Sequence, residues 1–168
     1  MHRRTKISFR ATLAAGLMMA GSVNAADTIT VKRMSMELAA DVAKAAVEEC
    51  RKRGYQVSAV VVDRNGIPQV MMRDVLSNRF TIQIAEDKAN AVIMSGVSSS
   101  EFRKNRADIR QEMNHVNGII MLEGGMPIRA GGSLLGAVGV SGAPGGDIDE
   151  ACARKAVESV QERLEFAD

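Results

Sequence analysis

The sequence predicts an α+β domain in which helices pack against an antiparallel sheet. Three observations lead to this fold class. Helical apolar spacing or helix-capping residues mark four segments, valine-rich runs lie between them, and short glycine turns separate those runs. The predicted order is helix, hairpin, two helices, three strands and a final helix, with five strands in all. Because the turns between strands are short, antiparallel pairing is expected.

The first two elements are a helix and a hairpin. Ser35 is a suitable N-cap, and apolar residues then recur three and four apart until Gly54. Residues 55–62 are rich in valine and lead into the turn 63–66, which ends in Asn-Gly. Residues 69–73 complete the predicted β-hairpin.

Two further helices are predicted next. Apolar residues repeat at helical spacing from Phe80 until Gly96. Ser98 and Glu101 have the spacing of a capping box, in which each side chain satisfies a free backbone N–H group of the other residue. This second helix is expected to extend to about His115.

The remaining chain contains three predicted strands and one helix. The strands are 118–122, 128–129 and 134–141, separated by glycine-containing bends. We expect Asp147 to cap the last helix, with Glu150 as its acidic third residue, and the helix to run to about Phe166. The free amides at its start could hold an anion, but the acidic residues favour capping over phosphate binding.

The first 25 residues have the pattern of an export signal. Four basic residues precede a short apolar stretch and a small-residue cleavage pattern that ends at Ala25. The general and twin-arginine export routes both stay open. Cleavage would leave residues 26–168 as a single domain that is periplasmic or secreted. Removing the four positive charges changes the formal net charge from +2 to about −2.

Several classes of protein are excluded by what the sequence lacks. The mature chain is slightly acidic, and few aromatic residues accompany the basic cluster at 103–110, so nucleic acid is not an expected partner. No apolar run reaches the ~20 residues of a membrane span. CxxC, HExxH, CxxCH and phosphate-loop motifs are absent. Glycines at every third position from Gly136 to Gly145 indicate tight turns and close packing.

The sulfur-containing residues leave two alternatives open. Cys50 and Cys152 lie on the first and last predicted helices, and they could form a disulfide if those helices pack side by side. Their alanine and valine neighbours favour free, buried thiols instead. The eight methionines after residue 25 are expected mainly as core residues, with Met71 and Met72 on opposite faces of a strand.

Charged residues at the ends of the predicted elements are candidate site residues. Asp63 follows a strand, Arg73 ends its hairpin partner, Lys88 lies among apolar residues, and Glu123 precedes a glycine bend. Each could be a structural cap or ion pair, or together they could supply the polar groups of an apolar pocket. His115 is the one histidine after residue 25. It could stabilise the C-terminal end of a helix or act as a metal ligand.

Several blocks together resemble the haem-degrading/haem-binding domain family, which includes glycolate-operon protein G and extracellular haem-binding protein S. The blocks are residues 60–66 (VVVDRNG), 73–74 (RD), 88–89 (KA), 124–127 (GGMP), 136–144 (GAVGVSGAP) and 149–153 (DEACA). The resemblance implies a profilin-like fold of α/β/α layers, homo-oligomers, and binding of haem or a related tetrapyrrole for scavenging, buffering or degradation.

The resemblance leads to two hypotheses about function. In the first, the protein binds haem, with His115 as axial ligand of the iron; Tyr55, a cysteine or a methionine are the other candidates. In the second, it binds or converts a small organic acid or carbonyl compound. Arg73 and Lys88 would hold the carboxylate, and Asp63 or Glu123 would act as acid or base. Gly124, Gly125 and Pro127 are expected beside the ligand in either case.

Overall fold

A computed structural model describes residues 27–166; the predicted export segment lies outside the described residues. The strands are β1 (Ser58–Asp63), β2 (Pro68–Arg73), β3 (Gly125–Ala130) and β4 (Ser133–Ser141). They form one antiparallel sheet in the order β2-β1-β4-β3. The helices are α1 (Met36–Lys52), α2 (Phe80–Ser95), α3 (Ser99–Asn105), α4 (Arg110–Met113), α5 (Gly146–Glu158) and α6 (Gln161–Glu165), with a 3-10 turn at Ala107–Ile109.

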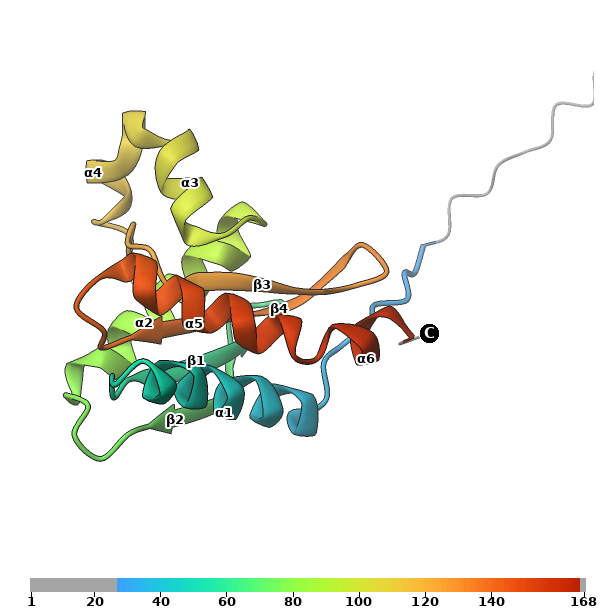
Figure 1. Cartoon of the computed structure of the whole chain (residues 1–168). Helices are drawn as coiled ribbons and strands as arrows, with labels where there is room; N and C mark the ends of the chain where they lie inside the picture. Colours follow the sequence, from blue (N-terminus) through green and yellow to red (C-terminus); the bar gives the residue numbers. More distant parts are fainter. Residues whose placement is uncertain (1–26, 167–168) are drawn as a thin grey trace, which may run out of the picture. The chain divides into compact units, whose positions relative to one another are not determined.

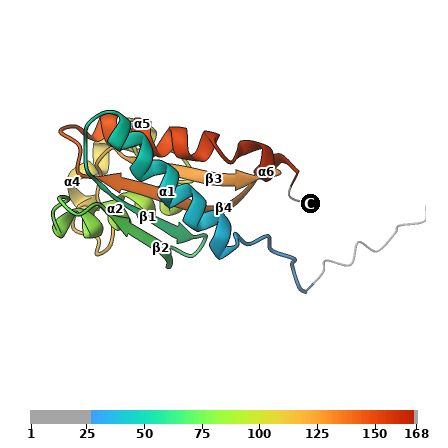
Figure 2. The ribbon, with the colours of Figure 1, turned by 60° about the horizontal axis from the view of Figure 1, so that its bottom comes forward.

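Helices cover both faces of the sheet, as the predicted α/β/α arrangement requires. Helices α1 and α5 run side by side on one face (Figures 1 and 2), where they bury the larger apolar cluster. Helix α2 covers the other face and buries a smaller cluster against β1 and β4. Alternate residues of β1 divide between the two layers, since Ala59 and Val61 face α1 whereas Val60 and Val62 face α2.

The predicted hairpin is confirmed, and one carboxylate organises its turn. Asp63 Oδ1 accepts hydrogen bonds from the backbone N–H groups of Asn65 (2.8 Å) and Ile67 (3.0 Å). Gly66 has a φ of +81°, a conformation that few residues other than glycine adopt without strain. The turn therefore depends on the Asp-x-Asn-Gly sequence itself.

The N-caps of α1 and α3 and the C-cap of α2 also follow the sequence. Ser35 Oγ accepts from Leu38 N–H (3.2 Å), and Ser98 Oγ accepts from Glu101 N–H (3.3 Å). Gly96 ends α2 with a φ of +73°. These contacts satisfy backbone groups that a helix end otherwise leaves unpaired.

The predicted helix from residue 98 to about 115 is instead three short pieces. The chain leaves the helical conformation at Arg106, whose φ is −122° and ψ is +43°. Phe102 and Met113 are the only buried apolar residues between 98 and 115. With one apolar anchor near each end, the segment lacks the continuous apolar stripe that holds a longer helix against a core.

The sheet has four strands rather than the predicted five, because residues 118–122 are not a strand. Their backbone donors are used elsewhere. Met121 N–H donates to the Asn114 side chain (2.9 Å), and Ile120 N–H donates to the Asp87 carbonyl of α2 (3.4 Å). The apolar run therefore lies along α2 and contributes Met121 to a small separate cluster.

The start and end of the last predicted helix also differ. Gly145 is the N-cap of α5 and makes no side-chain hydrogen bond, whereas Asp147 is exposed one residue inside the helix. The predicted capping role of Asp147 is therefore wrong. The helix ends at Glu158 and α6 follows, because Val160 leaves the helical conformation and Ser159 Oγ donates to the Ala156 carbonyl (2.7 Å).

Glycines in β4 allow close packing, as expected, against α2 at one position and against β1 at another. A Cβ atom at Gly139 would overlap the Ala85 carbonyl of α2, and one at Gly136 would overlap the Val62 carbonyl of β1. Both glycines have ordinary negative φ angles, so space rather than backbone conformation requires them.

Cys50 of α1 and Cys152 of α5 form a disulfide, with their Cα atoms 5.5 Å apart. The expectation of free thiols was wrong, and the alternative holds because the two helices lie side by side. The bond links residues 102 positions apart, so it closes a loop that contains the whole sheet.

Replacing both cysteines by alanine is predicted to lower the free energy of unfolding by about 4 kcal/mol, since a loop of this length restricts the unfolded chain strongly. Denaturant unfolding measures this loss. Reductant should destabilise the wild type by a similar amount and leave the variant unchanged; equal stability of the variant and the oxidised wild type would contradict the prediction.

Gly139→Ala is predicted to destabilise the protein by about 3 kcal/mol, since the added methyl group overlaps backbone that cannot move alone. Gly132→Ala is the control: its φ is +79° but no atom lies within 4 Å, so strain alone should cost about 1 kcal/mol. Thermal and denaturant unfolding compare the two. A smaller loss for Gly139→Ala than for the control would contradict the close packing.

Candidate functional site

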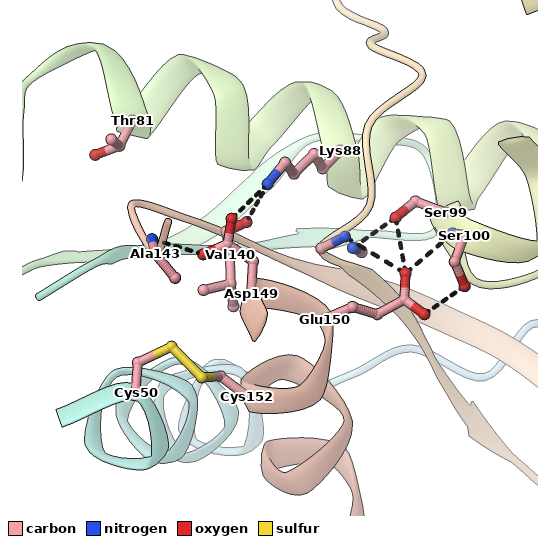
Figure 3. A network of polar contacts seen from close by, with 12 residues as sticks. Cys50, Thr81, Lys88, Ser99, Ser100, Val140, Ala143, Asp149, Glu150 and Cys152 are labelled. Atoms are coloured by element: carbon pink, nitrogen blue, oxygen red, sulfur yellow. Dashed lines mark hydrogen bonds and ion pairs between the residues drawn. A yellow bond between two sulfur atoms is a disulfide. The ribbon is translucent and has the colours of Figure 1, made fainter. Parts of the chain in front are cut away.

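A buried ion pair joins α2 to α5 beside the C-terminal end of β4. Lys88 is 2% exposed and Asp149 3% exposed. Lys88 Nζ donates to Asp149 Oδ2 (2.8 Å) and to the Val140 carbonyl (2.9 Å). Figure 3 shows the lysine reaching from α2 to both acceptors. The pair therefore connects helices that belong to opposite layers.

The environment of Asp149 favours its neutral form more than water does. Burial raises the pKa of its carboxyl group, and the ion pair with Lys88 offsets part of this effect. The other carboxylate oxygen accepts from the Ala143 backbone N–H (3.0 Å). A carboxyl with a raised pKa beside a buried ammonium group is typical of functional sites, although structural ion pairs share this property.

Glu150, the next residue, is also buried and points away from Lys88 (Figure 3). Its Oε2 accepts from Ser99 Oγ (3.2 Å) and Ser100 N–H (3.0 Å), and its Oε1 accepts from Ser100 Oγ (2.5 Å). Ser99 Oγ in turn accepts from Gly125 N–H (2.8 Å). Glu150 thus holds the first turn of α3 and the glycine bend before β3 against α5.

A pocket of about 390 Å³ lies beside the ion pair, and we call it the Lys88 pocket. It is lined by Ile84, Lys88, Arg103, Leu122, Glu123, Ser141, Asp149 and the segment 143–147. Arg103 Nη1 donates to Glu123 Oε1 at 2.7 Å. The pocket volume lies in the ~300–1,000 Å³ range of small-molecule sites, and its charged residues come from four separate segments.

A second cavity, of about 330 Å³, lies between α1 and β2, and we call it the α1–β2 groove. Val47 and Met72 supply its apolar surface, and its charged residues are Lys44, Glu48, Arg51 and Arg73. Arg51 pairs with the buried carboxylate of Asp74. The groove is therefore apolar inside and mainly cationic at its edges.

The structure brings some of the predicted site residues together. Lys88 and Glu123 both line the Lys88 pocket. Gly124 and Gly125 lie against the lysine itself: a Cβ at Gly124 would be 2.7 Å from Lys88 Nζ, and one at Gly125 would be 2.6 Å from the Lys88 carbonyl. Pro127 is half-buried in β3 opposite Ala137.

Other predicted residues lie elsewhere. Arg73 lines the α1–β2 groove, where its Nη1 donates to the carbonyls of Asp74 (3.1 Å) and Ser77 (2.5 Å). Asp63 caps the hairpin turn at the opposite end of β1 from the strand residues next to Lys88. Arg73 and Lys88 therefore belong to two different cavities.

His115 is exposed in the turn that follows α4. It lines neither the Lys88 pocket nor the α1–β2 groove. The disulfide occupies both cysteine sulfurs, which removes them as metal ligands. Within residues 27–166, no group of three or more His, Cys, Asp or Glu side chains is arranged to hold a metal ion.

Asp149 and Arg103 are site residues that the sequence did not reveal. In the sequence, Asp149 was interpreted as one of the acidic residues that favour the start of a helix. Its actual partner, Lys88, lies 61 residues away in the chain. Arg103 belongs to the basic cluster at 103–110, which was not assigned to a site from the sequence, yet it is half-buried and paired with Glu123. One sequence signal could have indicated a buried acidic partner. Lys88 is a charged residue among apolar residues, and a buried charge needs a partner of opposite charge.

The fold and cavities define a class: a three-layer domain with two separate cavities, one between α1 and β2 and one beside the Lys88–Asp149 pair. The family described as haem degrading protein HbpS-like matches residues 34–158, and the chain belongs to this family. A comparison with curated protein sequences gave no match. Among residues 27–166, no helix has the length and hydropathy to cross a membrane.

Solved structures agree with this assignment. HbpS is 34% identical, with a TM-score of 0.75 over 80% of this chain and 94% of that chain. A double mutant of HbpS from Streptomyces reticuli is 32% identical, with a TM-score of 0.75 over 89% and 99%. PduOC, solved in complex with haem, is 20% identical, with a TM-score of 0.67 over 76% and 95%, which shows the fold alone.

Lys88→Met is predicted to lower the free energy of unfolding by about 3–5 kcal/mol at neutral pH, because Asp149 would be left buried without its cation. The raised pKa of Asp149 would make this loss depend on pH. The contribution of Asp149 to the free energy of unfolding would be fully present below the ordinary carboxyl pKa. It would be lost as the pH rises through the raised pKa of Asp149.

Denaturant unfolding from pH 4 to pH 8 tests this sign, with the double variant Lys88→Met/Asp149→Asn as the control. The double variant should recover part of the loss at neutral pH and show less pH dependence. A single variant that becomes less stable as the pH falls would contradict the role of Asp149.

Proposed function

We propose that the protein is an exported binding protein for haem or a related tetrapyrrole. Membership of the HbpS-like family over residues 34–158 carries this proposal. A haem complex of a protein with the same fold, PduOC, supports it further. Because one fold can serve many functions, the proposal also needs a surface on this chain that suits the ligand.

The α1–β2 groove suits the chemistry of haem. The ligand combines a flat apolar ring with two carboxylate side chains. Val47 and Met72 offer an apolar surface for the ring, and the exposed cations Lys44 and Arg73 stand at the edge, where carboxylates would lie. The groove is open to solvent, so a ring larger than the cavity can lie partly outside it.

Met72 and His115 are the two alternatives for an axial contact with the iron, whereas Tyr55 packs against the apolar cluster beneath α1 and α5. Methionine and histidine both serve as haem ligands. Met72 lines the groove, and binding there makes its thioether the nearer candidate. His115, the axial ligand named in the haem hypothesis, would require haem to bind at the exposed turn after α4. The two sites are distinguishable by substitution.

Export and self-association are further parts of the proposal. The signal-like residues 1–25 support a periplasmic or secreted location, and a disulfide is typical of such oxidising compartments. Exposed apolar residues near the edge strand β2 support a homo-oligomer, since patches of this kind commonly mark interfaces. They are Met71, Val75, Leu76 and Phe80.

Haemin titration of residues 26–168, followed by absorption spectroscopy, tests the proposal. We expect a saturable shift of the Soret band. Lys44→Gln and Arg73→Gln should each weaken binding by about tenfold, because each removes a cation that can pair with a haem carboxylate. Lys104→Gln, an exposed lysine outside the groove, is the matched control and should not change the affinity. A loss of the Soret band over time would reveal degradation.

Met72→Leu and His115→Ala locate the iron contact. Met72→Leu should alter the Soret and visible bands while His115→Ala leaves them unchanged. The reverse result would place haem at the turn after α4 and contradict binding in the groove. Weak binding without saturation in the wild type would overturn the proposed function itself.

A further inference from the structure

We propose that the Lys88 pocket is a second ligand site, which binds the carboxylate group of a small monocarboxylic acid. The site is separate from the α1–β2 groove, because the residues that line the two cavities do not overlap. The inference therefore does not depend on haem binding.

Lys88 supplies the first reason. An ammonium group has three N–H donors, and the described structure engages two of them, one with Val140 and one with Asp149. The lysine lines the pocket although it is almost fully buried. A ligand oxygen could accept the third donor where little water competes, which strengthens a charge-assisted hydrogen bond.

Arg103 supplies the second reason. Its Nη1 bonds to Glu123, while Nε and Nη2 have no acceptor within the described residues. Its side chain is 37% exposed, so a ligand can reach it from solvent. Lys88 and Arg103 thus come from different helices to one pocket and bring donors suited to the two oxygens of a carboxylate.

The charges of the pocket explain why an acid can bind despite three nearby carboxylates. Asp149 is paired with Lys88 and Glu123 is paired with Arg103. Asp147 is exposed and makes no hydrogen bond or ion pair in the described structure. The start of α5 adds partly positive backbone N–H groups at Gly146 and Asp147. The unpaired Asp147 alone opposes the ligand, which makes it a useful test position.

The size of the pocket limits the ligand. About 390 Å³ lies near the lower end of the range for small-molecule sites, so the remainder of the acid must be short. Ile84 and Leu122 provide apolar surface for it. A short aliphatic acid such as propionate meets both requirements and serves as the probe.

The experiment is a titration of the disulfide-bonded mature protein with propionate, followed by backbone amide NMR. We expect saturable shifts at residues 143–147. Arg103→Gln should weaken binding by about tenfold, since it removes a charged donor and leaves Glu123 unpaired. Asp147→Asn should strengthen binding about threefold, because it removes an opposing charge that is exposed to solvent.

Two controls make the outcomes decisive. Arg106→Gln and Asp108→Asn alter an exposed ion pair that does not line the pocket, and neither should change the affinity. Propionamide, which has the same shape without the charge, should not bind. Saturable binding of propionamide equal to that of propionate, shifts confined to the α1–β2 groove, or no effect of Arg103→Gln would each overturn the inference. Failure of the haemin titration would leave these outcomes unchanged.

Discussion

The ion pair of Lys88 and Asp149 is the constraint on which the surrounding structure depends. Two buried charges are tolerated only when their geometry and remaining hydrogen bonds are satisfied. Here the Val140 carbonyl and the Ala143 amide complete the pair. The lysine also contributes to the need for glycine before β3: a Cβ at Gly124 would lie against both the Val140 carbonyl and the ammonium group, and its φ of +133° favours glycine as well. Burial of one charge is thus one of the constraints on a segment 36 residues later.

Two neighbouring carboxylates at the start of α5 bind different segments. Asp149 turns toward α2, whereas Glu150 turns toward α3 and the bend that leads into β3. Because they are adjacent on one helix, the positions of α2, α3 and the bend are set relative to one another. The Lys88 pocket lies among these segments. Its shape is therefore a product of buried polar contacts, and the apolar core contributes mainly the layers on either side.

The sequence was informative where the cause of a structure is local and uninformative where it is distant. Caps at Ser35, Ser98 and Gly96 and the Asp63 turn follow from residues a few positions apart, and they were predictable. Residues 118–122 have the composition of a strand, yet their amide groups bond to a helix and to a side chain. The Cys50–Cys152 bond and the partner of Lys88 depend on how helices pack, which periodicity does not encode.

The disulfide also determines how the molecule responds to a protease. Every strand and three of the six helices, α2, α3 and α4, lie wholly within the loop that it closes. The loop also includes the C-terminal end of α1 and the N-terminal half of α5. A cut at an exposed point inside the loop, such as the hairpin tip near Asn65 or the turn near Gly131, would leave both fragments covalently joined. A chain of this design can be cut once and keep its two fragments together, and a reductant would then release them.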